Sequence, residues 1–235
     1  DEYEVLQIGC AHRIIPINRR VKHMKKAMLP SLKIDSWTEE ALSDLTAKIS
    51  DNKVKSLILI DGAAGSGKTT LAVKLAERLH ANLVHTDDVS WCADPILWDG
   101  ELLDGIVRPW SAGKKAAYKP TGWKKENRPG AIEVDPDKAL IIEGMGAGRK
   151  TLRAAAEYLI WVDTEPETAR ARVVQRDLAN GENGGTVESV TEFADWWDSL
   201  LMPLFLEEEP WKYADIIVSG SQSDLISDKL MIHVV

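Results

Sequence analysis

The chain has 235 residues, of which 44% are hydrophobic, and its formal net charge at pH 7 is −8. This length and apolar content predict one α/β domain with an extension and a sizeable core. The negative charge argues against general nucleic-acid binding, and the lack of any run of 18 apolar residues argues against a membrane-spanning helix.

The cysteines and the start of the chain predict a cytoplasmic location. Only Cys10 and Cys92 are present, which is too few for a disulfide framework and predicts free thiols in a reducing compartment. The first four residues are acidic or aromatic, whereas a secretory signal begins with basic residues.

The first 50 residues are expected to form an N-terminal extension of undetermined role that ends in a helix. Residues 5–8 have the apolar character of a short strand. A basic stretch follows, which predicts a solvated surface segment or a face for a phosphate or acidic partner; it consists of Arg13, Arg19, Arg20, Lys22, Lys25 and Lys26. Ser36 is predicted to cap a helix with Glu39 as its capping-box partner, and the helix continues to residue 49.

Residues 62–69 match the phosphate-binding pattern G-x-x-x-x-G-K-[ST], also called Walker A. Glycines let consecutive N–H groups point into one hollow the size of an anion. Lys68 can reach the outer phosphates of a nucleotide, and the Thr69 hydroxyl can ligate Mg²⁺. The expected nucleotide-binding residues are Gly62, Ala63, Ala64, Gly65, Ser66, Gly67, Lys68, Thr69 and Thr70.

Short apolar runs alternate with helical segments over residues 51–235, which predicts one α/β domain. The predicted strands cover 56–60, 82–85, 139–142, 159–162 and 216–218. This order predicts a central parallel sheet with helices on both faces. Ligand-binding groups should then lie beyond the carboxyl ends of the strands.

Residues from about 91 to 138 are rich in proline and tryptophan and interrupt this alternation. Such a long insertion in a compact domain is typical of a lid or a substrate-binding arm, and we expect a substrate arm here. The Asn-Gly-Glu-Asn-Gly-Gly run at 180–185 predicts a mobile loop.

Carboxylates and arginines follow the predicted strands. One of Asp87 and Asp88 is expected to accept the proton of an acceptor hydroxyl, while the other caps a turn. A carboxylate at 87 and Glu143 could also hold Mg²⁺, although Glu143 could instead be a solvent-facing strand end. Arg172 and Arg176 are one helical turn apart and could straddle a transferring phosphoryl group, or form surface ion pairs.

Taken in order, these motifs resemble the uridine kinase group, within the larger set of P-loop kinases that includes phosphoribulokinase, pantothenate kinase and nicotinamide riboside kinase. The resemblance covers about residues 54–225. It rests on the phosphate loop, His85-Thr86-Asp87-Asp88, Ile142-Glu143-Gly144, Val162-Asp163-Thr164 with Arg172 and Arg176-Asp177, and residues 212–217.

The resemblance implies roles for matching residues. Asp87 would be the base at the acceptor hydroxyl, Glu143 would assist Mg²⁺, and Arg172 and Arg176 would belong to a lid over the phosphates at about 170–190. Asp99 matches a sugar contact in the arm, although it could equally be a turn or helix cap. The family's Tyr-Asp-Phe run corresponds to Thr121-Gly122-Trp123 here, so its Asp is missing, and Trp123 could stack on a base or sugar.

We therefore expect a cytoplasmic kinase that uses ATP and Mg²⁺ to phosphorylate a hydroxyl of a small molecule, with a nucleoside as the first expectation. Pantothenate, a riboside or a sugar is the alternative acceptor class, because Gly122 replaces the expected Asp. A nucleotide-binding switch without kinase activity is a second alternative. No nucleic-acid or membrane partner is expected, and a homo-oligomer is left open.

Overall fold

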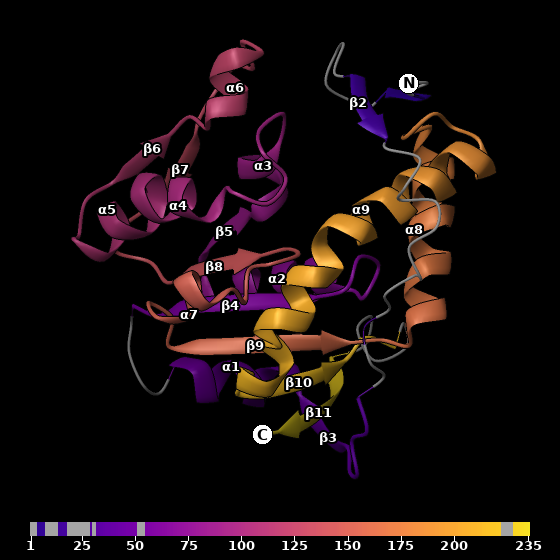
Figure 1. Ribbon diagram of the computed structural model, residues 1–235. Coiled ribbons are helices and arrows are strands. Elements are labelled where there is room, and N and C mark those ends of the chain that lie inside the picture. Colours follow the sequence, from indigo (N-terminus) through magenta and orange to yellow (C-terminus); the bar gives the residue numbers. More distant parts are fainter. Residues whose placement is uncertain (1–3, 8–13, 18–28, 30–31, 51–54, 222–227) are drawn as a thin grey trace.

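The computed structural model of the protein describes residues 4–7, 14–17, 29, 32–50, 55–221 and 228–235 (Figure 1). Its central element is a seven-stranded sheet with the strand order β3-β11-β10-β9-β4-β8-β5. Five of these strands are parallel, as predicted; they are β4 (Leu57–Gly62), β5 (Asn82–His85), β8 (Leu140–Glu143), β9 (Tyr158–Asp163) and β10 (Ile216–Ser219).

Two further strands extend the sheet on the β10 side. β11 (Lys229–Val234) pairs antiparallel with β10, and β3 (Thr38–Ala41) pairs antiparallel with β11. The sheet is therefore mixed rather than wholly parallel. Neither of these two strands was expected from the sequence.

Helices cover both faces of the sheet, as expected (Figure 1). Alternate residues of β4 face opposite sides: Ile58 and Ile60 pack with α1 and α2, whereas Leu57 and Leu59 pack with α9 and the arm. The helices are α1 (Leu42–Ser50), α2 (Lys68–Leu79), α3 (Thr86–Ser90), α4 (Asp99–Leu102), α5 (Arg108–Ser111), α6 (Thr121–Lys125), α7 (Lys150–Arg153), α8 (Pro166–Asn180) and α9 (Val187–Glu208), with a π-helix at Leu103–Val107 and a 3₁₀ helix at Pro210–Tyr213.

The predicted helix start at Ser36 is wrong. Residues 38–41 form β3, and α1 begins only at Leu42. Pairing with β11 favours the strand, and Lys229 on β11 forms an ion pair with Glu39 on β3 at 2.8 Å. Glu39 is thus a cross-strand partner and not a capping residue. The apolar face of the predicted helix is correct, because Leu42, Leu45 and Ile49 are all buried.

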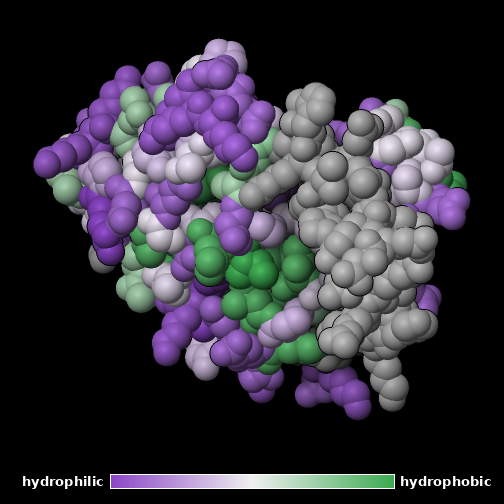
Figure 2. Space-filling view, turned by 45° about the horizontal axis from the view of Figure 1, so that its top comes forward, coloured by the Kyte–Doolittle hydropathy of each residue, from purple (hydrophilic) through white to green (hydrophobic). Residues whose placement is uncertain are grey.

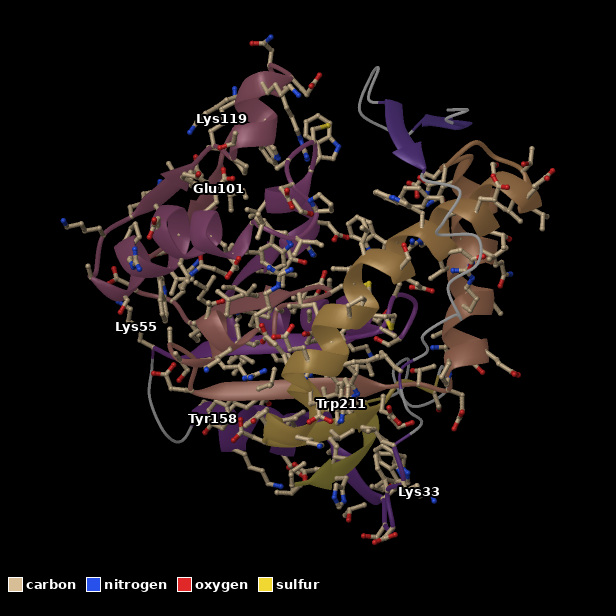
Figure 3. The ribbon with its side chains drawn as sticks, in the orientation of Figure 1. Lys33, Lys55, Glu101, Lys119, Tyr158 and Trp211 are labelled. Carbon is tan, nitrogen blue, oxygen red and sulfur yellow. The ribbon has the colours of Figure 1, made fainter. Side chains whose placement is uncertain are left out.

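The arm at 91–138 is ordered into α4, the π-helix, α5 and α6, together with a hairpin of β6 (Ala116–Tyr118) and β7 (Ile132–Val134). The Glu101 carboxylate accepts hydrogen bonds from the Tyr118 hydroxyl, at 2.7 Å, and from the Thr121 backbone N–H. Lys55 donates to the Trp110 carbonyl at 2.7 Å. Figure 3 shows Glu101, Lys119 and Lys55 on this side of the molecule, away from Trp211, which lies near the lower end of α9.

Near the N-terminus, β1 (Glu4–Gln7) and β2 (Ile14–Ile17) form an antiparallel pair. The strand expected at residues 5–8 overlaps β1, while the six residues of the predicted basic stretch lie outside the described part of the chain. Cys92 is disulfide-bonded, so the prediction of a free thiol there is wrong. A count of cysteines does not reveal which side chains come within bonding distance. None of the helices in the described ranges is long and apolar enough to cross a bilayer.

Candidate active site

The phosphate loop joins β4 to α2, as its motif requires. Gly67 precedes the first residue of α2 with φ = +104°, and Gly65 has φ = +76°. A Cβ atom on Gly65 would lie 2.2 Å from the Ala169 carbonyl oxygen of α8, so only glycine allows the loop to pack there. The loop therefore has the strand, turn and helix N-terminus that bind nucleotide phosphates.

Lys68 is buried at the start of α2, and its Nζ donates to the Ala63 carbonyl at 2.8 Å. Burial lowers the pKa of Lys68, while the nearby carboxylates of Glu143, Asp61 and Asp87 act in the opposite direction. The ammonium group thus lies inside the loop among three acidic groups, where it can neutralise added phosphate charge.

Glu143 ends β8, next to β4 and β5 in the sheet. Its Oε1 accepts a hydrogen bond from the Thr69 hydroxyl at 3.1 Å and lies 2.5 Å from His85 Nδ1. The hydrogen bond between His85 and Glu143 raises the pKa of His85. His85 is a residue to which the sequence analysis assigned no role, although the pairing of β5 with β8 places His85 opposite Glu143.

The Thr69 hydroxyl and the Glu143 carboxylate lie 3.1 Å apart beside the phosphate loop. These oxygen ligands fit Mg²⁺, which prefers hard oxygen donors and usually retains several ligands that are water molecules or phosphate oxygens. Within the described residues, no cluster of three or more His, Cys, Asp and Glu side chains could hold a metal by itself. Thr69 and Glu143 would thus contribute only part of the ligand shell, as expected where nucleotide phosphates supply the rest.

Asp87 and Asp88 both lie in the first turn of α3, but their side chains have different surroundings. Asp87 is exposed to the cavity that the phosphate loop lines. Partial enclosure by the protein raises its pKa by desolvation, while Lys68 opposes this effect. Asp88 instead forms an ion pair with Arg128 at 3.1 Å and does not line the cavity.

Both predicted arginines line the cavity from α8, but their contacts differ. Arg172 Nη1 donates to the Gly220 carbonyl at 2.7 Å and more distantly to that of Gly65, at 3.4 Å. It thereby joins the phosphate loop to the turn after β10. The Arg176 side chain is 58% exposed and forms an ion pair with the buried Asp177. Arg176 is thus the arginine with more freedom to approach a nucleotide.

The cavity has a volume of about 1220 Å³ and is lined by the phosphate loop, α3, the end of β8, α8 and α9. Asp99 and Trp123 are not among its lining residues. The Asp99 carboxylate pairs with Arg149 at 3.3 Å and accepts from Thr151 at 2.7 Å. Asp99 therefore has a structural contact in place of the expected sugar contact.

Trp123 is buried, and its indole N–H donates to the Asp88 carbonyl at 2.7 Å. The Arg128 guanidinium covers its ring at 3.8 Å from the centroid, so the ring is not available to stack on a base or sugar. Gly122 lies beside the Trp91 carbonyl, where a Cβ atom would be only 1.8 Å from the oxygen. This close approach explains why no Asp can stand at position 122 in this packing.

Helix α9 supplies a part of the cavity wall that was not predicted from the sequence. Five residues of α9 line the cavity: Phe193, Ala194, Trp197, Asp198 and Met202. Phe193 and Trp197 are one helical turn apart, which was visible in the sequence, but only the tertiary packing of α9 shows that they line the same cavity as Asp87 and the phosphate loop. Near the N-terminus, Leu29 and Leu32 also line the cavity.

Comparison with known proteins agrees with the fold and the phosphate loop. A family model described as "AAA domain" matches residues 58–190. The chain is 26% identical over 211 residues to the uridine kinase of Limosilactobacillus reuteri, in strains DSM 20016 and JCM 1112, and the match covers 77% of this chain and 93% of the relative.

Among solved structures, the YGR205w protein has a TM-score of 0.50 and 15% identity, over 77% of this chain and 93% of that one. A structure described as "a Possible Uridine Kinase from Bacillus stearothermophilus" has a TM-score of 0.48 and 20% identity, over 75% and 96%. The family model alone covers more than half of the chain. The chain therefore belongs to the AAA domain family, and the predicted resemblance of its P-loop domain to uridine kinase is confirmed.

Proposed function

We propose that the protein transfers the γ-phosphoryl group of ATP to a hydroxyl of a small molecule, with a nucleoside as the most favoured acceptor. The observation that carries this proposal is the convergence of Lys68, Thr69, Asp87 and Glu143 on one cavity. A passive nucleotide binder needs the loop but has no use for a carboxylate that faces the same space. The similarity to uridine kinase supports the choice of acceptor class.

In this proposal, the loop amides and Lys68 bind the nucleotide phosphates. Asp87 orients the acceptor hydroxyl and takes its proton as the oxygen attacks the γ-phosphorus and the bond to the β-phosphate oxygen breaks. Bound Mg²⁺, held through Thr69 and Glu143, would neutralise phosphate charge. Arg176 approaches the transferring group, while Arg172 holds the Gly65 turn against Gly220.

Desolvation raises the pKa of Asp87, and a higher pKa makes its carboxylate a better proton acceptor. Its partial enclosure in the cavity desolvates the carboxylate and raises the cost of the ionised form, and the Lys68 ammonium limits that cost. As nucleotide phosphates neutralise Lys68, the carboxylate becomes a stronger base. Proton transfer to Asp87 is therefore most favourable when the nucleotide is bound.

The first test is Asp87→Asn, measured as acceptor-dependent ADP release with uridine, cytidine, pantothenate and ribose as acceptors. An amide cannot take the proton, so we expect kcat to fall by at least about 100-fold. The affinity for ATP should stay within about threefold, because Asp87 contacts neither the loop nor Lys68 by a hydrogen bond in the structure.

Asp88→Asn is the matched control, because Asp88 neighbours Asp87 in α3 but faces Arg128. We expect it to lose less than tenfold in kcat. Near-normal turnover by Asp87→Asn would show that the role assigned to Asp87 is wrong. ADP release that no acceptor stimulates would instead favour a nucleotide-hydrolysing switch.

A further inference from the structure

One wall of the active-site cavity is an aromatic surface on α9. Phe193 and Trp197 are half-buried, and their rings are nearly parallel at 14°, with centroids 6.4 Å apart. Met202 and Ala194 line the cavity from the same helix. Hydrophobic residues also gather in the middle of the face of the molecule that Figure 2 shows. Because Phe193, Trp197 and Asp87 line the same cavity, it offers flat apolar surface in the space that Asp87 also borders.

Charged groups border this aromatic wall. Arg170 of α8 pairs with Asp195 at 2.5 Å and with Asp198 at 3.3 Å, and both Arg170 and Asp198 line the cavity. Their side chains are 20% and 27% exposed, so they remain accessible from the cavity. A flat ring on the wall would therefore meet hydrogen-bonding groups at its edge.

The arm supplies a smaller aromatic surface to this cavity, from Trp91, and the Arg128 guanidinium lies over that ring at 5.1 Å from its centroid. Among its described residues, only Trp91 and Cys92 line the cavity. The arm packs tightly against α3, since Arg128 covers Trp123 and ion-pairs with Asp88. Trp123, the arm residue expected to bind a ring, is therefore covered, and the larger aromatic surface of the cavity is the one on α9.

We propose that Trp197 and Phe193 of α9 bind the flat ring of the phosphoryl acceptor, and that the acceptor is a hydroxyl compound with an aromatic heterocycle. This inference rests on the proposed kinase function. Aromatic side chains stack on heterocycles with little dependence on the exact ring, and Arg170 and Asp198 would select among ring edges by hydrogen bonding. The pocket on α9, rather than the arm, then determines acceptor specificity.

The test compares Trp197→Ala with the wild type, with uridine and ring-free ribose as acceptors. Loss of stacking should raise the KM for uridine by at least about fivefold, while kcat and the KM for ATP stay within about twofold. Trp197→Phe should recover most of the loss, because it retains an aromatic face. Leu206→Ala is the control on the same helix, since Leu206 is 44% exposed and does not line the cavity.

Several outcomes would overturn the inference. An unchanged KM for uridine in a folded Trp197→Ala protein would overturn it. A rise in the KM for ATP alone would also overturn it, because that result would place α9 at the nucleotide. Equal use of ribose and uridine by the wild type would exclude a ring requirement.

Calorimetric titration of uridine separates this inference from the kinase proposal. If the wild type shows no acceptor-dependent ADP release, the proposed function fails. Uridine binding that is lost in Trp197→Ala and kept in Leu206→Ala would still support a ring site on α9. Absence of uridine binding to the wild type would overturn the ring site as well.

Discussion

At the scale of single residues, Asp61 links the two halves of the candidate active site. It is fully buried at the end of β4, and its carboxylate accepts hydrogen bonds from the N–H groups of Gly62, Gly146 and Gly148, at 2.7 to 3.0 Å. Gly62 begins the phosphate loop, while Gly146 and Gly148 belong to the loop after Glu143. Asp61 therefore fixes the distance between the nucleotide loop and the predicted Mg²⁺ carboxylate.

Replacement of Asp61 by Ala should destabilise the protein because it leaves three buried N–H groups without their acceptor. Relief of a buried charge offsets part of this loss, so we expect the free energy of unfolding to fall by roughly 1–3 kcal/mol at pH 7. Urea denaturation followed by circular dichroism measures this change. Asp61→Asn, which keeps one acceptor oxygen, should lose less than Asp61→Ala.

The same residue predicts a pH dependence. Burial raises the pKa of Asp61 from 3.8 to about 6, so the folded state binds this proton more tightly than the unfolded chain. Its contribution to stability is complete below pH 3.8 and is lost as pH rises through 6. The stability difference between the wild type and Asp61→Ala should therefore be smaller at pH 7 than at pH 5. A difference that grows with pH would contradict the assigned pKa shift.

The residues at strand ends could be predicted from the sequence, whereas those that depend on the arm could not. Lys68, Thr69 and Glu143 adjoin apolar runs whose parallel pairing fixes where they meet. Asp99 and Trp123 were assigned by position in a family pattern, yet their contacts depend on how the arm folds back on α3 and α7. No periodicity in residues 91–138 specifies that packing.

At the scale of secondary structure elements, the docking of α6 on the end of α3 holds the arm in place. Gly122 permits this contact, because a Cβ atom there would lie 1.8 Å from the Trp91 carbonyl oxygen and 2.9 Å from its carbon. These are backbone atoms, so the clash cannot be relieved by a rotamer change. The same docking places Trp123 and Arg128 over α3, which carries Asp87.

Gly122→Ala should therefore separate α6 from α3 and lower the free energy of unfolding by about 1–3 kcal/mol, as overpacking does. Gly100→Ala is the matched control: Gly100 lies in α4, and a Cβ atom there would meet nothing within 4 Å. We expect that control to be neutral or stabilising, by up to about 1 kcal/mol. Thermal unfolding of both variants measures the contrast, and equal melting temperatures would contradict the tight docking of α6.

The first and last elements of the sheet show where local sequence signals fail. Ser36 and Glu39 have the spacing of a capping box, but residues 38–41 pair with β11, which lies about 190 residues later in the chain. Capping contributes about 1 kcal/mol, and four residues of sheet pairing with a buried neighbour outweigh it. A local sequence pattern contains no information about such a distant partner. The five parallel strands could be predicted because each coincides with an apolar run in the sequence.

At the scale of the whole molecule, the sheet separates two hydrophobic clusters. One contains α9, the arm and alternate residues of β4, β8 and β9, and the other contains α1, α2 and the remaining strand residues. β11 contributes Leu230 and Ile232 to the second cluster, which also holds Leu71 and Leu75 of the helix after the phosphate loop. The strand that the sequence analysis missed is thus part of the support of α2.

Ile232→Ala tests this support. Ile232 is 2% exposed, so removal of its side chain should lower the free energy of unfolding by about 2–4 kcal/mol. Val234→Ala, on the same strand at 62% exposure, should change it by less than about 0.5 kcal/mol. Urea denaturation of both variants measures the contrast.

The kcat of the folded Ile232→Ala protein should stay within about twofold of the wild type, because the Thr69 hydroxyl donates a hydrogen bond to Glu143, which lies at the end of β8. Equal losses in the two variants would show that β11 does not lie in the core, whereas a selective loss of kcat in Ile232→Ala would show that this cluster positions α2 for catalysis.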